Sequence, residues 1–102
     1  TTGFSDGIFS VVNNSARTVT VTVALIDTPV YVESVDAEGW EVNAEFGFPA
    51  LDVILTTTLA PGAASTAVLF TIRVGEDKSR LLWRLMSPGF ASQDFYMTIR
   101  WN

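Results

Sequence analysis

The segment Arg17–Ile26, RTVTVTVALI, decides the fold of this chain. Apolar residues occupy every second position, and threonine or alanine fills the positions between them; the apolar residues are Val19, Val21, Val23 and Leu25. Successive side chains of a β-strand point to opposite faces. The pattern therefore predicts one long strand with an aliphatic buried face and a threonine-rich outer face. β-Branched residues suit such a strand because their stiff side chains lose little freedom on a pleated surface.

Other segments show similar alternation and extend the β pattern over the whole chain. They are Ile8–Val12, Val30–Val35, Leu51–Leu59, Thr66–Val74 and Phe95–Trp101. Leu81–Met86 is predicted to be either a strand or a single helical turn, and residues 43–50 receive no assignment. About seven short strands with frequent turn signals and no amphipathic helix are typical of an antiparallel β-sandwich. We therefore predict an all-β fold.

Turn residues separate these segments. Asp36-Ala37-Glu38-Gly39 and Ser87-Pro88-Gly89 are polar breaks, and Ala60-Pro61-Gly62-Ala63 is a tight turn. In that turn proline presets φ at the second position and glycine tolerates a positive φ at the third. We expect it to pair Leu51–Leu59 with Thr66–Val74 as a hairpin that shares one buried face.

Length and composition limit the classes of function. The 102 residues provide for one domain, residues 1–102, with one core. The chain has no cysteine, which excludes disulfides and thiolate metal sites, and no histidine, the commonest general base and metal ligand. No nucleophile or metal-ligand spacing occurs either. We therefore do not expect an enzyme, and we predict no cofactor and no metal.

Charge and hydropathy argue against two classes of partner. Eleven carboxylates oppose six cationic groups, so the net charge is −5 and a phosphate backbone would be repelled. The apolar runs are much shorter than a membrane span, so we predict no membrane insertion within this segment. The chain opens on Thr1-Thr2-Gly3 without a methionine and ends on Trp101-Asn102. We interpret it as a piece of a longer protein.

Three fragments resemble one family. Val11-Val12-Asn13-Asn14-Ser15 is similar to a "V-x-N-x-G/S" opening, Tyr31–Trp40 to an "F/Y-V-S-x…G-W" segment, and Leu59–Ser65 to an "L-x-P-G-x-S" turn. These motifs, in this order, belong to immunoglobulin-like repeat domains of large bacterial and archaeal cell-surface proteins, which are related to CARDB-like adhesion domains. The resemblance covers residues 8 to 74, and the last third of the chain has no counterpart in the pattern.

The resemblance implies an immunoglobulin-like sandwich from an exported, extracellular or cell-surface protein. It implies a non-catalytic role as a spacer, an adhesive unit or a packing partner. The implied partners are neighbouring domains of the same chain or other surface proteins. No catalytic residue follows from it, because the family has no catalytic motif.

Trp40 and Trp83 are the candidate ligand contacts. Trp40 follows Gly39 and lies between Glu38 and Glu41, so its ring and these carboxylates fit a polysaccharide. A carbohydrate-binding module is therefore the alternative function. The opposing interpretation is that the tryptophans belong to the core, where their large apolar area stabilises the fold. Of the three tryptophans, Trp101 has the parity of a buried strand position and Trp83, beside Arg84, is predicted to be the more exposed.

Two further features favour ordinary structural interpretations. The carboxylates of Asp36, Glu38, Glu41 and Glu45 offer oxygen ligands for calcium, but their spacing fits no loop motif and a solvated turn is the simpler prediction. Lys78 raises the internal Lys–Asn cross-link known in immunoglobulin-like surface domains, but it lies in a polar turn rather than in an apolar run. We interpret Asn13-Asn14-Ser15 as a turn rather than a glycosylation site.

Overall fold

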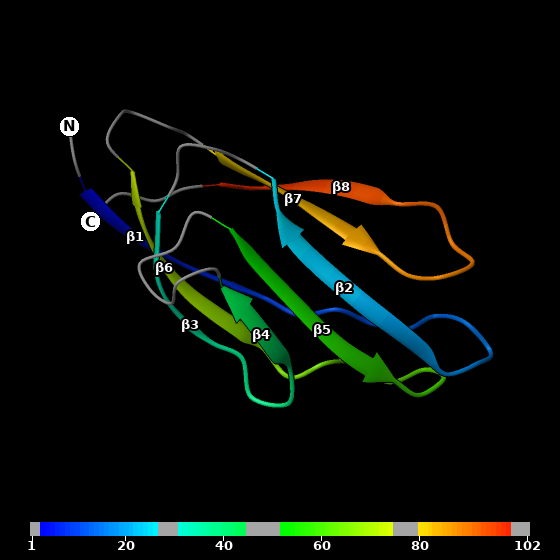
Figure 1. Ribbon diagram of the computed structural model, residues 1–102. Coiled ribbons are helices and arrows are strands. Elements are labelled where there is room, and N and C mark those ends of the chain that lie inside the picture. The colour runs from blue at the N-terminus through cyan, green and yellow to red at the C-terminus, as the bar shows by residue number, and fades with distance from the viewer. Residues whose placement is uncertain (1–2, 27–30, 45–51, 75–79, 99–102) are drawn as a thin grey trace.

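Two antiparallel sheets pack face to face in the computed structural model, which describes residues 3–26, 31–44, 52–74 and 80–98 (Figure 1). These residues form eight strands: β1 Gly3–Phe9, β2 Val19–Leu25, β3 Tyr31–Asp36, β4 Glu41–Ala44, β5 Val53–Leu59, β6 Val68–Val74, β7 Arg80–Met86 and β8 Gln93–Thr98. One sheet has the order β1-β6-β3 and the other the order β4-β5-β2-β7-β8. The predicted all-β sandwich is confirmed. No helix occurs in these residues, so none is long and apolar enough to cross a membrane.

Strand β2 lies at the centre of the five-stranded sheet, and the alternation correctly predicts which of its faces is buried. Val21, Val23 and Leu25 are buried, and Thr20 on the opposite face is exposed. One residue of the outer face departs from the prediction, because Ala24 is also buried. It pairs with Ile54 on one side and Arg84 on the other, and these larger side chains cover the small one between them.

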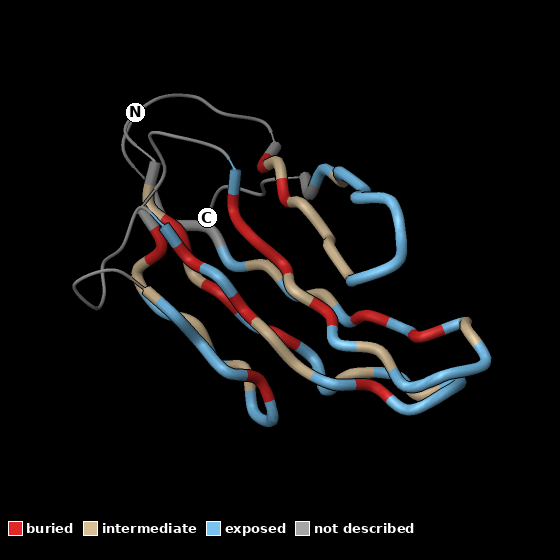
Figure 2. The backbone as a smooth tube through the Cα atoms, turned by 45° about the vertical axis from the view of Figure 1, so that its right-hand side comes forward, coloured by how far each residue is buried: buried red, intermediate tan, exposed pale blue. Residues whose placement is uncertain are grey.

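The core consists of aliphatic and aromatic side chains from both sheets. Figure 2 marks the buried residues along the backbone in red. Three buried rings belong to this core, and the partly buried rings of Phe9 and Phe95 pack against it. The ring centroid of Phe9 lies 6.5 Å from that of Trp40, 6.2 Å from Phe70, 5.4 Å from Trp83 and 6.0 Å from Phe95. Tilted and edge-on contacts at these separations suit the charge distribution of aromatic rings. The aromatic residues therefore join β1 and β6 to β7 and β8 across the sandwich.

A glycine provides the room for one of these rings. Gly7 of β1 pairs with Phe70 of β6, and the Phe70 ring lies over it. A Cβ placed on Gly7 would come within 2.2 Å of the ring. Any side chain at Gly7 would therefore displace a buried aromatic residue.

The predicted hairpin between Leu51–Leu59 and Thr66–Val74 is wrong. The turn itself forms, with Gly62 at φ 74° and a 3.0 Å hydrogen bond from the Ala63 N–H to the Ala60 carbonyl. However, β5 and β6 lie in different sheets. Both edges of β5 are already occupied, by β4 and β2, so the chain after the turn crosses to the opposite sheet.

Some strand positions also differ from the prediction. The first strand is Gly3–Phe9 rather than Ile8–Val12, and Val12 makes only an isolated bridge with Ala64. Leu81–Met86 falls within strand β7 and is not a helical turn. Residues 41–44, partly in the stretch left unassigned, form the short strand β4. The predicted turns at 36–39 and 87–89 are present, each with a glycine at positive φ.

The start of the first strand and the end of the last strand lie at the same end of the sandwich. Gly3 at the start of β1 pairs with Val74 at the end of β6, and Thr98 at the end of β8 pairs with Arg80 at the start of β7. We call this end the proximal pole (Figure 1). The opposite end, the distal pole, holds the connections 10–18, 37–40, 60–67 and 87–92.

Candidate functional site

Asn13 is the buried polar residue of the distal pole, with only 5% of its surface exposed. Its Nδ2 donates to the carbonyls of Arg17 at 2.8 Å, Leu59 at 3.0 Å and Ala60 at 3.1 Å. An amide nitrogen has two hydrogens, so one of them is shared between two carbonyls. Its Oδ1 accepts from the backbone N–H of Ser15 at 2.9 Å and from the Ser15 hydroxyl at 2.7 Å. Both the donor and the acceptor group of the side-chain amide therefore have hydrogen-bond partners within the protein.

Backbone hydrogen bonds join the same two loops. The Asn13 N–H donates to the Ala63 carbonyl, and the Gly62 N–H donates to the Asn13 carbonyl, both at 2.9 Å. Next to them, the Ser65 N–H donates to the Val11 carbonyl at 2.7 Å, and the Ser65 hydroxyl accepts from the Val11 N–H at 2.9 Å. We call the segments 11–15 and 59–65, joined in this way, the distal clasp.

The three fragments that carry the family resemblance meet at this end of the molecule. Two of them make up the clasp. The third reaches it through Thr66, whose hydroxyl donates to the Glu38 carbonyl and whose carbonyl accepts from Trp40 Nε1 at 3.4 Å. Motifs that are far apart in the sequence are therefore parts of one structural unit.

The distal clasp was only partly visible in the sequence. An asparagine two residues before a serine favours a local turn, which is present. The bonds from Asn13 to Leu59 and Ala60 span 46 and 47 residues, and no local signal predicts them. The role of Asn13 in joining the two loops therefore could not be predicted from the sequence.

Both candidate tryptophans lie in the core. Trp40 is 7% exposed and Trp83 is 0% exposed, so the prediction that Trp83 is the more exposed tryptophan is wrong. Trp83 pairs with Leu25 on one side and Phe95 on the other, and this parity directs its ring inward while Arg84 points outward. Neither indole presents a face on which a sugar ring can stack. Trp101 lies outside the described residues.

The acidic run does not assemble into a metal site in the part of the chain that the structure describes. Asp36, Glu38 and Glu41 are exposed around the β3–β4 turn. Across the described ranges, no three carboxylates lie close enough together to hold a metal ion. Glu45 and Lys78 fall outside the described residues.

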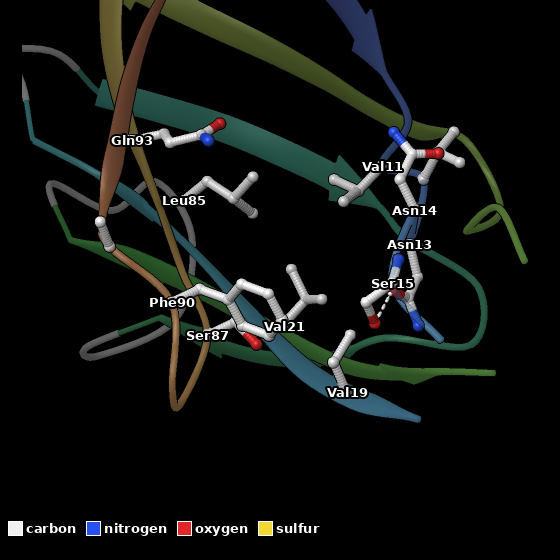
Figure 3. A pocket seen from close by; sticks show the side chains of 12 residues that line it. Val11, Asn13, Asn14, Ser15, Val19, Val21, Leu85, Ser87, Phe90 and Gln93 are labelled. Carbon is white, nitrogen blue, oxygen red and sulfur yellow. Dashed lines mark hydrogen bonds between the residues drawn. The ribbon is translucent and has the colours of Figure 1, made fainter. Parts of the chain in front are cut away.

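A pocket opens at the distal pole between the clasp and the β7–β8 loop (Figure 3). Its volume is about 370 Å³. The inner wall is aliphatic and consists of Val11, Val19, Val21 and Leu85. Polar side chains and one aromatic ring surround the opening; they are Asn14, Ser15, Ser87, Gln93 and Phe90.

The β7–β8 loop is held in place on its side of the pocket. The Phe90 N–H donates to the Ser87 carbonyl at 3.1 Å across a turn that places Gly89 at φ 84°. The Ser87 hydroxyl donates to the Thr20 carbonyl of β2 at 2.7 Å. The Arg17 guanidinium lies over the Phe90 ring, 5.3 Å from its centroid, within the range of a cation–π contact. Each wall of the pocket is therefore fixed by named contacts.

The shifted pKa values within the described residues belong to a surface ion pair rather than to this pocket. Arg84 Nε lies 2.8 Å from Asp94 Oδ1 on the outer face of β7 and β8. The hydrogen bond from Arg84 lowers the pKa of Asp94, and that bond also raises the pKa of Arg84. Both groups are exposed, so the pair contributes little to stability.

Comparison with known proteins provides no relative from which a role can be transferred. A scan against known protein families and searches of curated proteins and of solved structures found no match for this chain.

Proposed function

We propose that the domain is a non-catalytic structural and adhesive module of an exported surface protein, attached at its proximal pole. The family resemblance supplies the class of module and the extracellular or cell-surface location. The observation that supports this orientation is the position of Gly3 and Thr98 at one pole. The chain enters β1 and leaves β8 at this pole, and the distal loops lie at the opposite end of the sandwich.

The same geometry favours a lateral position over a load-bearing one. Hydrogen bonds between antiparallel strands run perpendicular to the strands. Tension between the first and last strands would act on the β1–β6 and β7–β8 pairs from their proximal ends. The bonds would then break one after another instead of resisting together in shear. A domain with this topology fits a side branch that presents its distal loops better than a spacer in line with tension.

Single-molecule force spectroscopy tests the orientation with two pulling geometries. Pulling between the two termini opens β1 from its end, whereas pulling between the N-terminus and a cysteine at the exposed position Ala67, just before β6, shears β1 along β6. We expect the first geometry to rupture at a markedly lower force than the second. Equal or higher resistance between the termini would identify a tension-bearing spacer and contradict the lateral arrangement.

The adhesive part of the proposal needs a separate measurement. Beads carrying the domain, tethered through its C-terminus, are passed over surfaces coated with the domain itself, with soluble polysaccharides or with surface-protein extracts. Retention above that of beads tethered through a cysteine at Ala60 in the distal clasp supports the proposal. Equal retention in both orientations, or none, would contradict it.

A further inference from the structure

The distal pocket has the features of a binding site for a small molecule. Ligand pockets usually have volumes of about 300 to 1,000 Å³ and walls that are mostly apolar. This pocket, at about 370 Å³, lies at the small end of that range. A single ring or a short acyl chain therefore suits it better than a polymer segment or a large cofactor.

The pocket is formed before any ligand arrives. The distal clasp fixes one wall through Asn13, and the Ser87–Thr20 hydrogen bond fixes the opposite loop. Gly89 has a positive φ of 84° in the turn of that loop, a conformation that would be strained for any other residue. Binding would therefore require little ordering of the loops, which lowers its entropic cost.

Around the opening lie apolar side chains that are exposed to solvent and polar side chains that form no hydrogen bond within the described structure. Phe90 is 48% exposed and Val12 is 52% exposed, on opposite sides of the opening. In the described structure the side-chain amides of Asn14 and Gln93 form no hydrogen bond. Large exposed apolar side chains around a pocket are a feature of interaction sites.

A charged side chain next to the pocket indicates the kind of ligand. Arg17 does not itself line the pocket, but its guanidinium lies over the ring of Phe90, which does. Arg17 is the sole charged residue in the connections 10–18 and 87–92, within a chain whose net charge is −5. Its guanidinium forms no ion pair with any described residue. A planar guanidinium matches a carboxylate in charge and geometry.

A neutral sugar fits less well. The aliphatic inner wall offers no partner for buried hydroxyl groups, and burying them without hydrogen bonds is unfavourable. The hydroxyls of Ser15 and Ser87 already donate within the protein, to Asn13 Oδ1 and to the Thr20 carbonyl.

We infer that the distal pocket binds a small carboxylate with an apolar body. The body occupies the aliphatic space beside Phe90, and Arg17 receives the carboxylate next to the pocket. This binding does not depend on the proposed adhesive role.

NMR titration with phenylacetate and octanoate, and with phenylacetamide and octanamide as neutral isosteres, tests the inference. We expect saturable shifts confined to the methyl groups of Val19, Val21 and Leu85 and to residues of the opening. The carboxylates should bind about fivefold more tightly than the amides, as expected for an exposed charge pair.

Two variants and one control assign the roles. Arg17→Gln should reduce the affinity for the carboxylates to that for the amides, because it removes the charge but keeps the backbone carbonyl that Asn13 uses. Phe90→Ser should weaken binding of both series. The control, Ile54→Ser, removes a side chain of similar exposure, 43%, from the outer face of β5 and should change neither.

The inference is overturned by any of three results. Shifts that are absent, or that spread over the surface without saturation, exclude a site. Equal binding of acids and amides with no effect of Arg17→Gln excludes the anionic class. Saturable shifts with a neutral oligosaccharide and none with the carboxylates would make this a sugar site. In each variant, unchanged shifts outside the distal pole verify that the fold is intact.

Discussion

Asn13 and Trp83 are both buried and both have a side-chain N–H group, yet they stabilise the molecule in opposite ways. Asn13, in the distal clasp, uses its amide for five hydrogen bonds. Trp83 lies in the core, and its ring centroid is 5.4 Å from that of Phe9 and 5.3 Å from that of Phe70. Its Nε1 has no hydrogen-bond partner within the described structure. The clasp therefore depends on hydrogen-bond geometry, whereas the core depends on apolar area.

This difference has a consequence for substitutions. Hydrophobic cores tolerate changes that preserve volume and polarity pattern. A buried hydrogen-bond network fails when one member is replaced, because the remaining groups are left unsatisfied. The core and the distal clasp should therefore respond differently to conservative changes.

The largest expected effect is a charge in the core. Val23→Asp would bury an unpaired carboxylate at a position with no exposed surface, and we expect it to unfold the domain. Total stability is only about 5 to 15 kcal/mol for a domain of this kind. Thr20→Asp on the exposed face of the same strand is the control and should melt close to the parent. Similar thermal melts for both variants would contradict the facing of β2.

The next largest effect is expected in the distal clasp, where the same substitution can be made at two adjacent asparagines. Asn13→Asp keeps the shape but replaces the Nδ2 donor with an oxygen that faces three carbonyls, and we expect a loss of about 3 to 5 kcal/mol in urea unfolding. Asn14→Asp makes the same chemical change at the adjacent exposed residue and should cost less than about 0.5 kcal/mol. Equal losses would mean that the clasp bonds do not stabilise the fold.

A smaller effect is expected at Trp83. Trp83→Phe removes apolar contacts but also removes a buried donor that has no partner, so the two changes partly cancel. We expect a loss of about 1 to 2 kcal/mol by urea unfolding, below that of Asn13→Asp. A loss larger than that of Asn13→Asp would reverse the comparison between core and clasp.

The smallest effect belongs to the exposed ion pair. Arg84 lowers the pKa of Asp94 below its ordinary value of 3.8, so the pair stabilises the folded state above that pH and loses its contribution as the pH falls through the lowered pKa. Asp94→Asn should remove this small acid-dependent part. Melting temperatures at neutral and acidic pH measure it, and high salt should reduce the difference between parent and variant. An identical pH dependence in both proteins would argue against the pair.

The sequence predicts what depends on neighbours along the chain. The alternation from Val19 to Leu25 predicts β2 and its buried face, because the side to which a strand residue points depends only on its position along the strand. The inward position of Trp83 was obscured because apolar residues occupy both faces of Leu81–Met86, including the half-buried Leu82. Parity alone could not distinguish the two faces there.

Features that depend on contacts between distant segments cannot be predicted from the sequence pattern. The path of the chain after Gly62 follows from β4 and β2 occupying both edges of β5. The bonds from Asn13 to Leu59 and Ala60 join segments 46 and 47 residues apart. The pocket beside Phe90 requires residues near the start of the chain to meet residues near its end. The sequence therefore predicts the class of fold and the core strand, but neither the distal clasp nor the pocket.

Amide hydrogen exchange of the native protein, followed by NMR, compares the stability of the distal clasp with that of the sheets. The hydrogen bonds across the clasp should hold it as firmly as the sheets are held. We expect the N–H groups of Asn13, Gly62 and Ser65, each hydrogen-bonded across the clasp, to exchange as slowly as those at the centre of β2. Exchange of these three groups at the rate of an open loop, while β2 stays protected, would contradict this expectation.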